Sequence, residues 1–181
     1  MRLYILRHAK RWFRRSQDPS IMRNTLVSSD SSIGDYTYIG YNCSVTKARI
    51  GRYCSIADNV SIGPGEHDHR EISTSSLFYE DMYNKLTSAK CVIGNDVWIG
   101  VDSIVRRGVR IGDGAVIGAN SFVNSDIPDF AIAVGNPAKV IKHRFNEDKI
   151  RRIKESRWWD FEIKKAKEII REIAIRDALH E

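Results

Sequence analysis

An aliphatic residue returns every six positions along most of this chain, and this period constrains the fold more than any other feature. A second track of small or β-branched residues lies two positions before most of the aliphatic sites. A period of six matches neither the 3.6 residues of an α-helix turn nor the alternation of an ordinary strand. The first track is Val27, Ile33, Ile39, Val45, Ile50, Ile56, Ile62, Ile93, Ile99, Val105, Ile111, Ile117 and Val123, and the second is Thr37, Cys43, Ala48, Cys54, Val60, Val97, Ser103, Val109, Ala115 and Ser121.

Such a repeat predicts an all-β core, a left-handed parallel β-helix of hexapeptide repeats with three short strands in each triangular coil. The large side chains fill the axis, the small ones fill the corners, and glycine permits tight corners. Stacked coils pair strand on strand at ~4.8 Å. Thirteen aliphatic sites at three per coil predict about four coils. Under this interpretation Cys43 and Cys54 are interior side chains without a catalytic role.

The flanking and interrupting segments suggest three parts. Residues 1–20 form a basic amphipathic segment, residues 21–142 the β-helix, and residues 143–181 a C-terminal helical segment in which Asn146 is a plausible helix N-cap. Within the β-helix, residues 64–91 lose the period and are expected to project from one edge as a loop anchored by Phe78, Tyr79, Met82 and Tyr83. The basic segment either caps the open end of the coils or, through residues 1–15, contacts an anionic membrane surface or an acidic partner.

Charge and composition exclude several classes of protein. The net charge is +6, and residues 2–15 carry six basic side chains before the first acidic residue, Asp18, so the rest of the chain is balanced. A general nucleic-acid surface is therefore not expected. No apolar run is long enough to span a membrane, and three cysteines without metal spacing favour the cytoplasm.

His67 is the strongest candidate for a catalytic residue. It lies where the regular coil gives way to the loop, a place that holds a side chain more accurately than a loop tip does. An imidazole can accept a proton at neutral pH and so act as a general base. His69 lies two residues further into the loop and is the weaker candidate. A zinc site would require three convergent ligands, and no further histidine lies on the coils, so we expect no metal.

Five motifs together resemble the hexapeptide xenobiotic acetyltransferases, a group that includes chloramphenicol and streptogramin acetyltransferases and related sugar O-acetyltransferases. The resemblance covers roughly residues 27–162. Its motifs are Gly65-Glu66-His67, Asn95-Asp96-Val97-Trp98-Ile99-Gly100, Gly135-Asn136-Pro137-Ala138-Lys139, Arg144-Phe145 and Trp158-Trp159-Asp160.

The resemblance implies acetyl-CoA as co-substrate and a homotrimer with active sites between subunits. It assigns to His67 the deprotonation of an acceptor hydroxyl that attacks the thioester directly. It also implies a binding site for CoA, in which Trp98 lines the pantetheine channel and Lys139 and Arg144 pair with phosphates. The CoA-binding residues expected on this basis are Trp98, Gly118, Ala119, Ser121, Asn136, Pro137, Lys139 and Arg144.

The acceptor is the least constrained part of the interpretation. The loop stretch Ser73–Tyr79 resembles members that acetylate sugars in polysaccharide or glycolipid synthesis, with Ser76 where proline is common. We therefore expect acetyl transfer to a hydroxyl of a saccharide or other small molecule. Alternatives are an antibiotic O-acetyltransferase of the chloramphenicol or streptogramin type, an amino-sugar N-acetyltransferase, or a non-catalytic trimeric binding scaffold.

Overall fold

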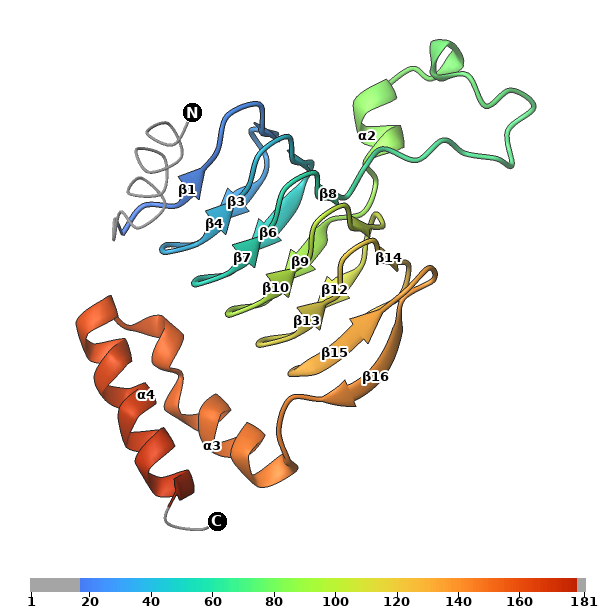
Figure 1. Ribbon diagram of the computed structural model, residues 1–181. Helices are drawn as coiled ribbons and strands as arrows, with labels where there is room; N and C mark the ends of the chain where they lie inside the picture. Colours follow the sequence, from blue (N-terminus) through green and yellow to red (C-terminus); the bar gives the residue numbers. More distant parts are fainter. Residues whose placement is uncertain (1–16, 179–181) are drawn as a thin grey trace, which may run out of the picture.

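The computed structural model describes residues 17–178 and shows a three-sided prism of stacked parallel coils (Figure 1). Each complete coil contributes one short strand to each of three sheets, here called A, B and C. The predicted left-handed parallel β-helix fold class of hexapeptide repeats is confirmed. The strands, in sheet order, are β1 (Ser20–Ile21), β4 (Tyr38–Ile39), β7 (Ser55–Ile56), β10 (Trp98–Ile99), β13 (Val116–Ile117), β15 (Ala131–Val134) and β16 (Lys139–His143) in sheet A; β2 (Leu26–Val27), β5 (Ser44–Val45), β8 (Ser61–Ile62), β11 (Ile104–Val105) and β14 (Phe122–Val123) in sheet B; and β3 (Ser32–Ile33), β6 (Ala48–Ile50), β9 (Cys91–Ile93) and β12 (Arg110–Ile111) in sheet C.

The expectation of about four coils was too low. Sheet A stacks six parallel strands and is closed by β16, which pairs antiparallel with β15. Two strands of sheet A, β1 and β15, lie outside the aliphatic track, and each of them adds a coil to the stack. At one end Ser20 and Ile21 pair with Tyr38 and Ile39. At the other end β15 carries Ala133 on the axis in place of a large aliphatic residue and pairs with β13.

Both tracks of the repeat lie in the interior, as the period predicted. Axis residues such as Ile39, Ile56 and Ile117 are fully buried, and every residue of the small-side-chain track is buried too. Val27 and Ile33 are only partly buried because they lie in the first coils, where the stack is open at the end. The thiols of Cys43 and Cys54 therefore fill corners of the core.

The three edges of the prism are turns with residues in the left-handed conformation. At the A–B edge these positions are occupied by Asn24, Asn42, Asn59, Asp102 and Asn120, with φ between 55° and 61°. Asparagine and aspartate adopt this conformation more readily than most residues. The side chains of the first four also form a ladder of hydrogen bonds from coil to coil, and its last bond joins Asn59 Nδ2 to Asp102 Oδ1 at 2.8 Å.

The insertion between β8 and β9 leaves the prism at the B–C edge and projects from it (Figure 1). It contains a 3-10 helix, η1 (Ser76–Phe78), and a short helix, α2 (Met82–Leu86). Tyr83 anchors α2 by donating a hydrogen bond to Asp30, and Tyr79 is half-buried within the loop. The prediction that Phe78 and Met82 also anchor the loop is wrong, because both side chains are exposed.

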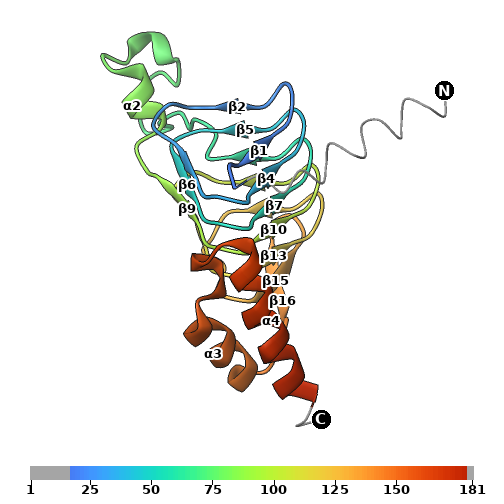
Figure 2. The ribbon, with the colours of Figure 1, turned by 90° about the vertical axis from the view of Figure 1, so that its left-hand side faces the viewer.

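The C-terminal helices pack against the C–A edge. They are α3 (Glu147–Ser156), a 3-10 turn η2 (Trp158–Asp160) and α4 (Ile163–Ala178), and Figure 2 shows them side by side. Asn146 is the N-cap of α3, accepting from the backbone N–H of Lys149 at 2.9 Å. Trp158 and Trp159 are buried with Phe130 and Ile153 in a second apolar cluster. None of the helices among residues 17–178 combines the length and apolar character needed to cross a bilayer. Residues 1–15, for which a membrane contact was considered, lie outside the described residues.

Candidate active site

His67 extends from the base of the loop and is exposed to solvent. Its Nδ1 lies 2.5 Å from the backbone carbonyl oxygen of Thr74. A carbonyl oxygen can only accept a hydrogen bond, so this contact requires the proton on Nδ1. Nε2 of the neutral ring is then unprotonated and can accept a proton. The ring of Tyr79 lies beside the imidazole, with 6.3 Å between the ring centroids.

The backbone just before His67 is firmly held. The Glu66 N–H donates to the Leu86 carbonyl at 2.9 Å, which joins the two sides of the loop. The Glu66 carboxylate accepts two hydrogen bonds from the Arg106 guanidinium, at 2.8 and 2.9 Å. A bidentate pair of this kind restrains orientation as well as position. The base of the loop thus presents His67 from a fixed point.

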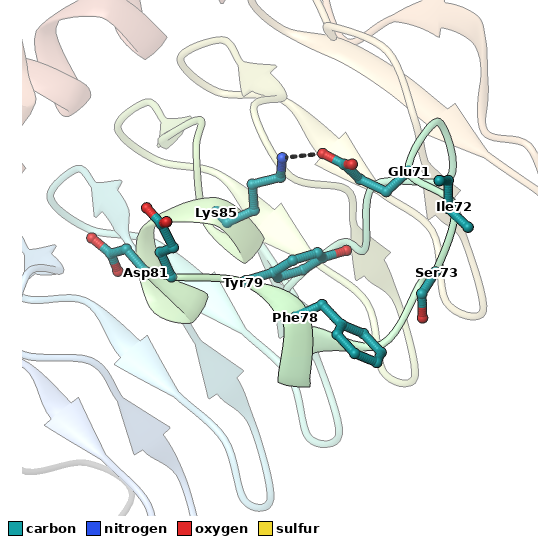
Figure 3. Close-up of a pocket in the computed structure, with 8 residues that line it drawn as sticks. Glu71, Ile72, Ser73, Phe78, Tyr79, Asp81 and Lys85 are labelled. Atoms are coloured by element: carbon teal, nitrogen blue, oxygen red, sulfur yellow. Dashed lines mark hydrogen bonds and ion pairs between the residues drawn. The ribbon is translucent and has the colours of Figure 1, made fainter.

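The outer part of the loop forms a cavity of about 780 Å³ next to Tyr79, which is open to solvent (Figure 3). Carboxylates of Glu71, Glu80 and Asp81 contribute to its lining, together with the Phe78 and Tyr79 rings. Lys85 donates a hydrogen bond to Glu71 at 2.8 Å and lies over the Tyr79 ring. Aromatic faces with carboxylate acceptors make a surface suited to a ligand rich in hydroxyl groups.

Five of the eight residues expected to bind CoA are exposed along sheet A and the A–B edge. Trp98 points outward from β10 in sheet A and is 55% exposed. Ala119 lies in the neighbouring A–B edge, and the turn with Asn136 and Pro137 stacks on the same edge, because the Phe122 N–H donates to the Gly135 carbonyl. Lys139 begins β16 and is exposed on sheet A.

The other three have evident structural contacts. A side chain at Gly118 would come within 2.7 Å of Val134 in the next coil. The Ser121 hydroxyl is buried and accepts from the Gly135 N–H at 3.1 Å. Arg144 lies at the C–A edge, where it donates to Asp96 and to the Gly114 carbonyl at 3.1 and 2.7 Å. Phosphate binding by Arg144 stays a prediction, since this guanidinium already has two partners.

Sequence reasoning missed the groups that support His67. Thr74 acts through a backbone carbonyl, which no residue pattern announces. The Glu66–Arg106 pair spans 40 residues and becomes visible only when β8 and β11 are known to be neighbours in sheet B. Across residues 17–178 no group of three His, Cys, Asp or Glu side chains is placed to hold a metal ion.

Comparisons with known proteins agree with this architecture. A family model described as bacterial transferase hexapeptide (six repeats) matches residues 90–125. A chloramphenicol acetyltransferase of Klebsiella aerogenes is 42% identical over 134 residues, which cover 68% of this chain and 64% of the relative. A probable macrolide acetyltransferase of Lysinibacillus sphaericus is 36% identical over 137 residues, which cover 70% of this chain and 73% of the relative.

A solved structure points the same way. A galactoside acetyltransferase in complex with coenzyme A superposes with a TM-score of 0.54 at 29% identity, covering 72% of this chain and 66% of that one. The chain spans 62 to 64% of the length of the chloramphenicol acetyltransferases that it matches. The coils and the relatives together identify this chain as a member of the hexapeptide-repeat acetyltransferase family.

Proposed function

We propose that the protein transfers an acetyl group from acetyl-CoA to an acceptor hydroxyl, with His67 as general base. The observation that carries this proposal is the contact between His67 Nδ1 and the Thr74 carbonyl. It leaves the Nε2 lone pair available in an exposed position at the edge of the prism. A general base needs this tautomer and this access.

In the proposed reaction His67 moves one proton. Nε2 accepts the proton of the acceptor hydroxyl as its oxygen bonds to the acetyl carbon, and the carbon–sulfur bond breaks. The imidazolium then returns the proton to the departing thiolate, so the ring ends as it began. The Thr74 carbonyl stabilises the imidazolium by accepting from Nδ1–H throughout. Acetyl-CoA supplies the activated acetyl group.

The exposed residues of sheet A and the A–B edge fit an extended pantetheine arm. The Trp98 indole offers an apolar face, Ala119 keeps the edge narrow, and the Asn136–Pro137 turn adds a polar rim. Lys139 supplies a positive charge for a phosphate. Gly118, Ser121 and Arg144 would contribute by holding this backbone in place. His67 lies on the B–C edge, so one chain carries the base and the CoA surface on different edges.

A homotrimer would resolve this separation. Sheet B lies between the A–B edge and the B–C edge. If three prisms turn their sheets B toward a common threefold axis, the A–B edge of each chain meets the B–C edge of the next. Sheet B exposes apolar Leu26 and Ile104, whereas sheet C exposes Arg49 and Arg110. An apolar outward face favours association through sheet B.

The cavity in the loop favours a saccharide as acceptor. Its carboxylates can accept hydrogen bonds from several hydroxyls, and the Tyr79 and Phe78 rings can pack on the apolar face of a sugar. A second candidate is an antibiotic hydroxyl, favoured by the names of the chloramphenicol and macrolide acetyltransferases to which the chain is similar. An amino-sugar amine would use the same base.

The first test is to replace His67 by alanine and to measure free-thiol release from acetyl-CoA against a panel of sugars, nucleotide sugars and antibiotics. We expect the wild-type chain to turn over with at least one sugar. His67→Ala should lower kcat by about 10²–10⁴, the usual contribution of a general base. His69→Ala, an exposed histidine two residues away, serves as the matched control and should retain the wild-type rate.

The panel separates the candidate functions. Turnover with chloramphenicol or a macrolide and with no sugar would select the antibiotic candidate. An N-acetyl product on an amino sugar would select the amine. A wild-type rate in His67→Ala would exclude the proposed mechanism.

A further inference from the structure

Arg107 is buried at the B–C edge, and its guanidinium contacts only backbone oxygens among its hydrogen-bond partners. It follows β11 and lies one coil beyond the point where the loop departs. The guanidinium donates to four carbonyls, those of Gly63, Pro64, Thr46 and Ala89, at 2.9 Å for Thr46 and 3.1 Å for Ala89. Burial lowers the pKa of this guanidinium, yet an arginine remains charged at neutral pH.

The four carbonyls belong to three separate stretches of chain. Gly63 and Pro64 form the stem by which the chain leaves β8, and Ala89 belongs to the stem by which it returns to β9. Thr46 lies on the preceding coil. One planar group with five N–H donors therefore joins both stems of the loop to each other and to the prism. A lysine ammonium, with three donors on one atom, can satisfy only part of this set.

Gly63 is shaped to this arrangement. Its φ of +63° is in the left-handed region, and a side chain there would lie 2.7 Å from the Thr46 oxygen and 3.1 Å from Arg107 Cζ. The guanidinium can approach the Gly63 carbonyl because no Cβ intervenes. A buried arginine and a glycine in the left-handed conformation thus contact each other at one stem of the loop.

The held stem leads directly to the proposed base. Pro64 is three residues before His67, and between them the Glu66 N–H bonds to Leu86 on the opposite stem. We propose that Arg107 is a positioning residue, which fixes the base of the loop and thereby the place from which His67 meets the acceptor. This inference rests on the proposed function. Arg107 acts through the backbone and does not contact the imidazole in any hydrogen bond described.

A positioning role and a purely structural role predict different kinetics. If Arg107 holds His67, its loss should lower kcat and leave KM for acetyl-CoA unchanged, because the residues proposed to bind CoA at this site belong to the neighbouring chain and the hydrogen bonds of Arg107 are to carbonyls of its own loop and coil. If Arg107 only stabilises the prism, its loss should lower the melting temperature and the amount of folded enzyme while the folded fraction keeps its kcat.

The experiment compares Arg107→Gln and Arg107→Lys in the full chain with Arg110→Gln, which removes the same charge from an exposed position on sheet C. Measurements are kcat, KM for acetyl-CoA and for the acceptor, and amide hydrogen exchange over residues 64–90. We expect Arg107→Gln to lower kcat by about 10–100-fold, the range of a misplacement near 1 Å. Exchange in the loop should rise, Arg107→Lys should lie between, and Arg110→Gln should match the wild type.

Two outcomes would overturn the inference. One is a wild-type kcat in Arg107→Gln. The other is loop exchange that is unchanged while exchange rises across the coils. If Arg107→Gln does not fold, the same measurements on Arg107→Lys decide between the roles. Should the wild type prove inactive with every acceptor, the proposed function fails, and the exchange data still report independently whether Arg107 holds the loop.

Discussion

Burial determines the chemistry of the three cysteine side chains. Cys43, Cys54 and Cys91 are all buried and form no disulfide. Burial raises the pKa of Cys54 to about 12 and raises the pKa values of the other two thiols as well. The thiols are therefore protonated at pH 8, and a protonated thiol is a poor nucleophile.

We expect no reaction of the native protein with DTNB at pH 8, and reaction of all three thiols after unfolding in guanidinium chloride. The absorbance of the product released from DTNB, recorded before substrate is added to a turnover assay, measures the reaction of these thiols directly. Stoichiometric labelling of the folded chain within minutes would contradict the burial of these side chains. The prediction also has practical value, since an unreactive enzyme adds no background to an assay of released CoA thiol.

At the scale of single residues, the sequence predicted which residues lie in the interior, but it did not predict every residue that adopts the left-handed conformation at the edges of the prism. The Ile and Val track and the small track were predictable because the six-residue period places them on the axis and at the corners. The left-handed positions follow the same period, and Asn59 or Asp102 suit them. Tyr36 and Tyr53 do not, since bulky residues rarely adopt a φ near 60°. Their rings stack at 4.6 Å, and Trp158 packs on Tyr53, so contacts distant in sequence favour these conformations.

At the scale of elements, α4 is attached to α3 by a buried carboxylate. Asp177 on α4 is buried and lies 2.8 Å from Lys149 and 2.5 Å from Arg152, both on α3. Hydrogen bonds from Lys149 and Arg152 lower the pKa of Asp177. A lowered pKa in the folded state means that the stabilisation is complete above the ordinary pKa and is lost as pH falls through the lowered value.

Acid should therefore loosen α4 at a pH below about 4, the ordinary range of an aspartate. Fluorescence of Trp158 and Trp159, which lie in the cluster that α4 covers, can follow this change. Asp177→Asn should lower the melting temperature at pH 7 and flatten the acid transition. Asp148→Asn, which removes an exposed partner of Arg151, should change neither. If Asp177→Asn showed the same acid transition as the wild type, the transition would belong to another titrating group.

The insertion could be located from sequence, because the loss of the period at Ile62 and its return at Ile93 delimit it. Its internal structure could not be foreseen. Short elements such as α2 depend on contacts with distant residues, here the hydrogen bond from Tyr83 to Asp30. The same limit applies to the candidate site, where the position of His67 at the base of the loop was predictable and its contact with the Thr74 carbonyl was not.

At the scale of the whole molecule, the proposed trimer can be tested through its faces. Sedimentation should give a mass three times that of the 20.7 kDa chain. Ile104 is 41% exposed on sheet B, and Ile104→Arg would place a charge in the proposed interface. We expect this variant to be monomeric and inactive, because the base and the CoA surface would then no longer meet.

Arg49→Glu on sheet C is the control for that experiment. It reverses a charge on a face outside the proposed interface and should leave both mass and rate unchanged. A trimer that persists in Ile104→Arg and dissociates in Arg49→Glu would assign the contact to the other face.

The insertion joins the β-helix at a single corner, between β8 and β9. These two strands pair with the next coil in the same register as the other strands of their sheets. At the equivalent corner of the next coil, between β11 and β12, four residues suffice. The β-helix therefore does not need the loop in order to continue from one coil to the next. If the loop binds the acceptor and sheet A binds the thioester, as proposed, exchange of this one segment could change the acceptor and leave the CoA surface as it is.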